Sequence, residues 1–510
     1  MGEKSFGFEA IEVATWQRER VVHGITETKR CDWPLRSSFS KDRGRFLRLC
    51  TTKGFSMAML GFLALLLLES APVLAQEEVY EKVPTPSSVD QMITPMDMSF
   101  QERLWRPGLL PWLTEQLKDT PAFFRDTKLD YNFRTFYLNQ QNTDAKTKES
   151  WAIGGALSYQ SGWALDHFSI GAVGYTSQPL YAPEDHAGTK LLGPDQESIT
   201  VLGQIYGKVK LIGDNYLNLY RYQYDTPFLN SSDNRMIPNT FEGYTLTGTY
   251  GGEDGSPGLR YGFGYIDKIK LRDSDEFVSM SEAAGAPQVN RGVSIAGANF
   301  SCRGFELGAI DYYSQDIINI AYAETRYRLN VVDGLGLLFS AQFTEQQSTG
   351  SELLTGSEFH TSQFGLMTAT SYRNGILTLA YTNSSTGADL RSPWGDYPGY
   401  TAVQVEDFDR AGEQAFMLKG SYNFARFGLD DISVYALWTH GWSAVDSDTK
   451  AHVFQQDEYD FDVQWRPKKC VLQGLWFRAR FAHVDSRDDN TSGFPINEVR
   501  FIVNYDFELL

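Results

Sequence analysis

Arginine pairs separated by a single residue can bind anions if both project from the same face of a strand. Arg478 and Arg480 form one such pair, and Arg326 and Arg328 form another. On neighbouring strands such pairs would build a column of cations, which offers an anion or a carboxylate successive weak sites that bind it and still release it. Alternation assigns Lys208, Lys210 and eight further cations to this face, and these eight form the candidate ladder: Arg134, Arg326, Arg328, Lys419, Arg466, Arg478, Arg480 and Arg500.

The elements that must position these cations are strands with one apolar and one polar face. The chain ends in RFIVNYDFELL, where Phe501, Val503 and Tyr505 occupy one face, with Arg500 and Asn504 on the other. A soluble β-sandwich can show the same alternation. Many such strands behind a secretion signal are more typical of a transmembrane β-barrel, whose apolar face meets lipid and whose polar face surrounds water.

Eighteen alternating segments follow one another between residues 128 and 509. Short connections, such as 301–304 and 373–375, alternate with long ones, such as 225–240 and 384–412. Bacterial barrels place their short turns toward the periplasm and their long loops outside. A barrel of about 16 to 18 strands leaves an aqueous channel. We therefore expect an all-β fold, a transmembrane antiparallel β-barrel of 18 strands that forms a pore.

The inward-facing cations also have a simpler interpretation. They could solvate a wide lumen, or pair with the acids that the same alternation turns inward, namely Asp130, Glu324, Asp460 and Asp462. In both interpretations the charged side chains avoid the lipid face, where a single Arg or Lys costs ~2–4 kcal/mol at mid-membrane. The residues alone leave both interpretations open.

A secretion signal precedes the strands. Residues 57–68, MAMLGFLALLLL, are apolar but shorter than the roughly 20 residues that a membrane-spanning helix needs. The following Val73-Leu74-Ala75 offers the small residues of a cleavage site. We expect residues 57–75 to be a signal peptide and residues 1–56 to be a mis-assigned start or an extended leader. Residues 76–122 would be an N-terminal periplasmic segment, and residues 123–510 the barrel.

Composition narrows the class of function. The chain has 46 Lys and Arg residues against 64 Asp and Glu residues, a formal net charge of −18. Nucleic-acid-binding proteins are typically basic, so we expect no nucleic acid partner. Beyond the leader the cysteines are Cys302 and Cys470, which do not have the spacing of a metal site. We therefore expect no metal and no cofactor.

Four segments, in order along the chain, carry a family resemblance. They are FFRDTKLDYNFRTFYLN from Phe123 to Asn139, SSDNRMIPNTFEGYTLTG from Ser231 to Gly248, DFDRAGEQAFMLKGSYNFARFGL from Asp407 to Leu429, and GLWFRARFAHVDS with NEVRFIVNYDFELL at the end. From Phe123 onward the sequence resembles the OprD family of outer-membrane porins, over nearly all of the chain that follows the signal.

The resemblance implies an 18-stranded porin in the outer membrane of a Gram-negative bacterium. Its third external loop would fold inward and narrow the channel, together with the loop between strands 13 and 14. The resemblance assigns five residues to this constriction: Asp233, Asn234, Arg235, Thr240 and Phe241. The segment 384–406 departs from the second constriction loop of the family, so no substrate contacts are carried over there.

The function implied by the resemblance is passive, partly selective uptake of small carboxylate-bearing solutes. Such solutes are amino acids, small peptides and organic or aromatic acids, and the eight cations would be the ladder that binds them. The expected partners are outer-membrane lipid, lipopolysaccharide and small-molecule solutes. The chain would be a monomer or a weak homotrimer.

Two alternatives come from other classes of function. Some outer-membrane barrels are lipases or proteases, which need a nucleophile and a base within ~3 Å of each other. Histidines such as His440 and His483 lie in no recognisable nucleophile motif, so we expect no catalytic residues and no enzymatic activity. A loop-based adhesin or receptor is the other alternative, and it would give no current steps in a planar bilayer.

Overall fold

The computed structural model describes residues 109–142, 145–252, 256–429, 431–468, 472–487 and 495–510. The leader and the signal peptide expected at residues 1–56 and 57–75 lie outside these residues. The strands are β1 Lys128–Asn142, β2 Lys148–Gln160, β3 Phe168–Tyr181, β4 Ile199–Lys210, β5 Asp214–Tyr222, β6 Thr240–Gly251, β7 Gly258–Lys270, β8 Phe277–Ser279, β9 Val293–Cys302, β10 Phe305–Ser314, β11 Ile318–Val332, β12 Leu335–Ser348, β13 His360–Tyr372, β14 Gly375–Ser384, β15 Gln414–Asn423, β16 Ile432–Trp442, β17 Gln455–Trp465, β18 Leu475–Arg487 and β19 Ile496–Glu508.

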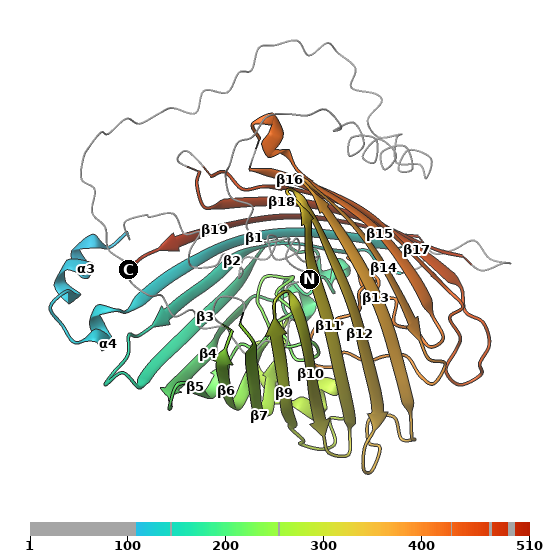
Figure 1. Ribbon diagram of the computed structural model, residues 1–510, viewed down its shortest axis with the longest axis horizontal. Helices are drawn as coiled ribbons and strands as arrows, with labels where there is room; N and C mark the ends of the chain where they lie inside the picture. Colours follow the sequence, from blue (N-terminus) through green and yellow to red (C-terminus); the bar gives the residue numbers. More distant parts are fainter. Residues whose placement is uncertain (1–108, 143–144, 253–255, 430, 469–471, 488–494) are drawn as a thin grey trace, which may run out of the picture.

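The strands form one antiparallel sheet that closes on itself (Figure 1). Consecutive strands pair with each other, and β1 also pairs with β19, where Asp130 lies opposite Glu508. The three-residue β8 is added to the end of β7, which also pairs directly with β9. Within the described residues, 18 strands therefore make the barrel wall, and the expected fold is confirmed.

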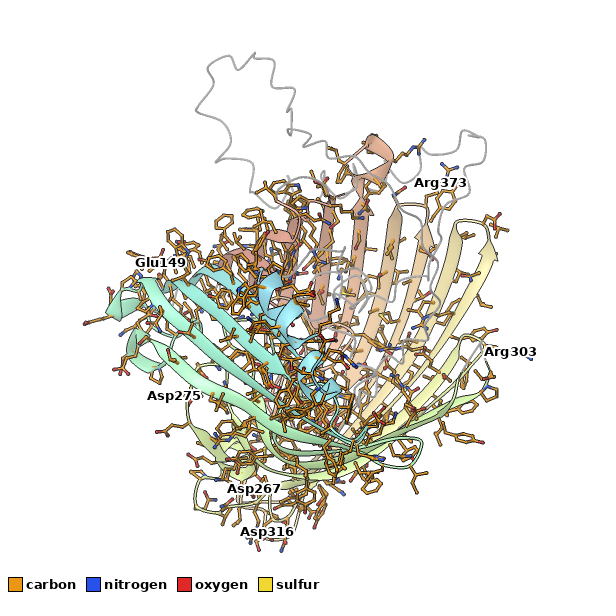
Figure 2. All side chains as sticks on the ribbon, turned by 90° about the vertical axis from the view of Figure 1, so that its left-hand side faces the viewer. Glu149, Asp267, Asp275, Arg303, Asp316 and Arg373 are labelled. Atoms are coloured by element: carbon orange, nitrogen blue, oxygen red, sulfur yellow. The ribbon has the colours of Figure 1, made fainter. Side chains whose placement is uncertain are left out.

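Short turns and long loops lie at opposite ends of the barrel. Arg303 and Gly304 join β9 to β10 as a two-residue turn with φ values of 46° and 82°, the left-handed backbone that a tight hairpin requires. Figure 2 shows Arg303 and Arg373 at one end of the barrel, with Glu149 and Asp275 at the other. By the rule for bacterial barrels, the end with Arg303 and Arg373 is the periplasmic end.

The long connections are named here by their order along the chain. They are loop 2 (182–198), loop 3 (223–239), loop 4 (271–292) and loop 7 (385–413). Loop 2 contains the 3-10 helices η3 (Glu184–His186) and η4 (Pro194–Gln196), and loop 4 contains β8 and α5 (Met280–Ala284). A further 3-10 helix, η6 (Phe424–Phe427), lies in the periplasmic turn after β15.

Loop 3 and loop 7 fold into the barrel and pack against part of its inner wall. Phe228 of loop 3 and Trp394 and Tyr397 of loop 7 join one buried cluster with Tyr312 of β10 and Tyr322 of β11. The ring centroid of Phe228 lies 5.9–6.2 Å from those of the three tyrosines. We call this cluster the loop core. The inner faces of β10 and β11 are apolar there because protein, and not water, covers them.

A smaller cluster joins loop 2 and loop 3 to the inner face of β1. Leu191 of loop 2 and Met236 and Ile237 of loop 3 pack against Phe136 and Leu138. All five side chains are at most 2% exposed. The loops therefore occupy the lumen beside β1 as well as beside β10 and β11.

The described part of the N-terminal segment lies at the periplasmic end. The backbone N–H groups of Leu109 and Leu110 donate to the carbonyl oxygens of Glu508 and Leu509, both at 3.0 Å. The helices α3 (Pro111–Leu117) and α4 (Ala122–Arg125) follow and lie beside the start of β1 (Figure 1). Among the helices that the structure describes, none is long and apolar enough to cross a membrane.

Candidate functional site

Charged side chains collect on the inner face of β15 to β19, which we call the charged wall. Lys419, Arg478 and Arg500 are only 5%, 6% and 4% exposed, whereas Phe461 and Phe501 on the outer face of the same strands are 42% and 45% exposed. Strand alternation produces this separation, because successive side chains point to opposite faces. The inward direction predicted for these cations is therefore what the structure has.

Two arginines share a single carboxylate on this wall. The Asp462 Oδ2 atom accepts a hydrogen bond from Arg478 Nε at 2.6 Å and lies 3.3 Å from Arg480 Nε. In the pairing of β17 with β18, Asp462 lies directly opposite Arg480. One carboxylate thus interacts with two guanidinium groups, which holds Arg478 and Arg480 beside each other on the inner surface.

Arg480 also lies directly opposite Arg500 in the pairing of β18 with β19. Like charges in this position destabilise a strand pair, and nearby groups offset the repulsion. Arg500 pairs with Glu498 at 2.5 Å, and Arg480 Nη2 donates to the Tyr435 hydroxyl at 2.9 Å. Lys419 Nζ lies 4.4 Å from the centroid of the Tyr435 ring, a cation–π contact. Lys419, Arg478, Arg480 and Arg500 are thus brought together.

The cations predicted on β11 lie on a different part of the wall. Arg326 pairs with Glu324 at 2.9 Å, and the same carboxylate accepts the Tyr400 hydroxyl of loop 7 at 2.7 Å. Arg328 pairs with Glu306 of β10 at 2.7 Å. The structure therefore does not place Arg326 and Arg328 in one column with the charged wall.

Arg466 lies beside the charged wall at its periplasmic edge. Its guanidinium lies 4.7 Å from the centroid of the Trp476 ring, and the guanidinium of Arg478 lies 6.0 Å from the same centroid. Both guanidinium groups therefore lie near the same indole ring, and Arg466 is next to the cations it was predicted to join.

Arg134 holds loop 3 in place. Its Nη1 donates to Asp233 Oδ1 at 2.6 Å and to the Arg235 carbonyl oxygen at 2.5 Å, while its Nε donates to Asn504 Oδ1 of β19 at 2.8 Å. The side chains of Arg134 and Asp233 are 6% and 9% exposed. A buried, hydrogen-bonded pair of this kind fixes the position of a loop, because separating it leaves an unpaired buried charge.

Two of the five residues assigned to the constriction do not line an opening. Thr240 and Phe241 begin β6, where they pair with Lys270 and Ile269 of β7, and both are 0% exposed. Phe241 belongs to the loop core, with its ring centroid 6.1 Å from that of Tyr224. The expectation that they stand at the channel surface is corrected, because neighbouring residues cover both side chains completely.

Loop 7 connects the loop core to the charged wall. At one side, Trp394 is 0% exposed and its Nε1 donates to the Met280 carbonyl oxygen of α5 at 2.9 Å. At the other side, the backbone N–H groups of Val405 and Glu406 each donate to a carboxylate oxygen of Glu458 on β17 at 2.8 Å. Loop 7 is therefore fixed at both sides of the lumen.

Gln404 completes this attachment. Its backbone N–H donates to Asp460 at 3.2 Å, its side-chain amide donates to Glu498 at 3.1 Å, and its carbonyl oxygen accepts from Arg500 Nη2 at 3.0 Å. Sequence reasoning missed Gln404 and Glu458. Alternation around Asp460 could have identified Glu458 as an inward acid, but no sequence signal reports a contact with a loop fifty residues away.

The base of loop 7 contains an acid whose protonation depends on its surroundings. Burial, and then the neighbouring Asp407 and Glu413, raise the pKa of Asp409 to about 8. Burial also raises the pKa of Glu406. These shifts follow from the cost of placing a carboxylate out of water and beside other carboxylates.

Two of the histidines pair with acids on the outer face, near the long loops. His360 lies 2.8 Å from Glu345, and His440 lies 3.0 Å from Asp457. Within the described ranges, no group of three or more His, Cys, Asp or Glu residues is placed to hold a metal ion.

Comparison with known proteins identifies the family. A model described as "outer membrane porin, OprD family" matches residues 121–509. No curated protein matches the chain. Among crystal structures, OccK9 (OpdG) of Pseudomonas aeruginosa is 22% identical, with a TM-score of 0.67 over 76% of this chain and 99% of that one.

Two further crystal structures are similar to the chain. OccAB3 of Acinetobacter baumannii is 21% identical, with a TM-score of 0.67 over 75% of this chain and 99% of that one. OpdK of Pseudomonas aeruginosa, in a crystal structure with vanillate, is 19% identical, with a TM-score of 0.65 over 75% and 99%. The likeness of these structures agrees with the closed barrel, and the match of the family model shows that the chain belongs to the OprD family of outer membrane porins.

Proposed function

We propose that this porin takes up small carboxylate-bearing solutes passively along the charged wall. The solutes are amino acids, small peptides and organic or aromatic acids. The observation that carries the proposal is the sharing of Asp462 between Arg478 and Arg480, because it holds two guanidinium groups side by side on the inner face, where a solute carboxylate can interact with them. A carboxylate suits a guanidinium, which presents planar N–H donors to both oxygens.

The acids of the charged wall hold the arginines in position and thereby help solute carboxylates to pass. Asp462 uses Arg478 Nε, but each guanidinium has five N–H donors. Glu498 holds Arg500 in the same way at 2.5 Å. Guanidinium groups that are fixed by neighbouring carboxylates bind a further carboxylate weakly, and weak successive sites permit release as well as binding.

A similar protein supports the class of solute. The crystal structure of OpdK contains vanillate, which carries a carboxylate. We extend that chemistry to this chain because its own wall presents Arg478, Arg480 and Arg500 together. The proposal concerns the carboxylate and not the rest of the solute.

The test is carboxylate-dependent block of single-channel current through the full chain in planar bilayers. The double variant Arg478→Gln/Arg480→Gln should weaken block by about tenfold or more, because the loss of a single charge-assisted hydrogen bond already costs ~1.5 kcal/mol, which is about a tenfold change in affinity. Arg487→Gln is the matched control, since Arg487 is exposed and bound to Asp485 on the outer face. Equal block in the double variant and the unchanged protein would contradict the proposal that the charged wall binds carboxylates.

A further inference from the structure

Two arginines from different loops meet at one amide oxygen. Arg235 Nη1 of loop 3 and Arg272 Nη1 of loop 4 both donate to Asn234 Oδ1, at 3.2 Å and 2.5 Å. The Asn234 Nδ2 atom donates to Asp396 Oδ2 of loop 7 at 2.9 Å, which fixes the amide with its oxygen toward the arginines. Two guanidinium groups are therefore neighbours across a neutral acceptor.

A third cation lies beside this pair. Arg235 Nε donates to the Thr189 carbonyl oxygen of loop 2 at 2.9 Å, which brings the next residue, Lys190, close to the arginines. Partial burial, and then the positive charge of Arg272, lower the pKa of the Lys190 ammonium, while Asp273 opposes the change. We call Lys190, Arg235 and Arg272 the loop cation triad.

Acids also lie near the triad. Asp396 Oδ1 lies 3.5 Å from Arg272 Nη1, a long contact, and Glu498 favours the charged form of Arg235 from the wall. Burial, and then the charges of Arg500 and Arg272, nevertheless lower the pKa of the Arg235 guanidinium. Arg500 and Arg272 each act more strongly on Arg235 than Glu498 or Asp396 does.

The triad keeps hydrogen-bond donors for a ligand. The bonds of Arg272 use only Nη1, and those of Arg235 use Nε and Nη1. Toward the part of the chain that the structure describes, Arg272 Nε and Nη2, Arg235 Nη2 and Lys190 Nζ donate no hydrogen bond. The Arg272 side chain is 20% exposed and Lys190 is exposed, so a solute can reach these donors.

We propose that the loop cation triad is a capture site for the oxyanion of a solute, a carboxylate or a phosphate, which binds there before it reaches the charged wall. Paired guanidinium groups suit the planar geometry of such oxyanions, and clustered charge of one sign raises the rate of encounter with the opposite charge. Loop 4 lies at the end opposite Arg303 and Arg373, where Figure 2 labels its Asp275. Loop 4, which carries Arg272, therefore belongs to the external end of the barrel, and the capture site rests on the proposed uptake function.

The experiment measures the association rate of a blocking anion added to either side of a planar bilayer that contains the full chain. The probes are succinate and inorganic phosphate. Lys190→Gln and Arg272→Gln should lower the association rate from the long-loop side by about threefold to tenfold, with a smaller change from the periplasmic side. Arg272→Lys should restore part of the rate, and Arg487→Gln should leave it unchanged.

Lys190→Gln is the variant least expected to disturb folding, because Lys190 is exposed and its side chain forms no hydrogen bond or ion pair with the residues that the structure describes. Unchanged association in both glutamine variants would overturn the capture site. If the charged-wall variant still weakened block in that case, the proposed function would stand without the capture site. Block by phosphate and not by succinate, lost in Arg272→Gln, would support the capture site and contradict carboxylate uptake.

Discussion

The loop core and the charged wall are built from the same alternating strands but present opposite chemistry to the interior. Beside the loop core, the inner wall carries Tyr312 at 0% and Ile320 at 0% exposure. On the charged wall, the corresponding inward positions carry Asp462 and Arg478. Alternation therefore sets which side chains point inward in both regions. Their polarity differs because packed loops cover the inner wall at the loop core.

The two regions also gain stability in different ways. The loop core removes large aromatic and aliphatic surfaces from water, at ~25 cal/mol per Å². The charged wall gains little net energy from its ion pairs, because taking both charges out of water offsets their attraction. Substitutions in the loop core should therefore act on folding, whereas those on the charged wall should change ion selectivity and also destabilise the fold wherever a buried charge loses its partner.

The largest effect is expected in the loop core. Trp394→Ala should lower the stability of the packed loops by ~3–5 kcal/mol, because a large buried side chain leaves a cavity and the Met280 carbonyl oxygen loses its donor. Loop 7 should then leave its position, and single-channel conductance should rise. Trp112→Ala, at a residue 58% exposed on α3, is the control. Unchanged conductance and unchanged thermal unfolding in Trp394→Ala would contradict a structural role for the loop core.

A change in ion selectivity is expected on the charged wall, together with a loss of stability, because two buried arginines lose their shared carboxylate. Asp462→Asn removes the carboxylate that Arg478 and Arg480 share while keeping its size. The anion-to-cation permeability ratio should rise about twofold or more, because an uncompensated charge near the path changes the local potential. Reversal potentials in a salt gradient measure this ratio.

The control for this substitution lies on the same strand. Asp457→Asn changes the same type of charge on the outer face, where Asp457 bonds to His440. If both variants gave the same reversal potential, this would contradict the claim that the charge of Asp462 controls ion selectivity.

The smallest effect is expected at the boundary between the two regions. Asp409 has an ordinary pKa of 3.8 that rises to about 8 in the folded loop, so folding favours its neutral form. Its contribution to the packing of loop 7 is fully present below about pH 4 and is lost as pH rises through about 8. Current fluctuations from loop 7 should therefore increase between pH 5 and pH 9.

The variant Asp409→Asn should flatten this dependence on pH. The groups that face Asp409 are Asp407, Glu413 and Asp389, and Arg410 bonds to Glu413 at 2.6 Å. The asparagine keeps the shape of the neutral acid and has no proton to lose. An equally steep dependence in the variant would assign the titration to another group.

The architecture could be predicted because it depends on local pattern. Period-two alternation, short turns such as Arg303-Gly304 and long loops together specify the number, order and direction of the strands. The inward direction of Arg478, Arg480 and Arg500 follows from the same pattern. None of these inferences requires knowledge of which distant residues touch.

The contacts of the candidate site could not be predicted, because they depend on how distant strands and loops meet. Arg134 was expected on a ladder, but its partner Asp233 lies in a loop that alternation does not place. Arg480 and Arg500 face each other only because of the register between β18 and β19. The burial of Phe241 depends likewise on loops that fold inward.

The seam between β1 and β19 has a consequence for the assembly of the protein. There Asn132 donates to Asp506 at 2.6 Å across 374 residues of sequence. Contacts between such distant positions carry a large loop-closure entropy and form slowly. The pairing of β1 with β19, which closes the barrel, therefore cannot form until the last strand is in place. Until then the edge of β1 is unpaired and can pair with a wrong strand.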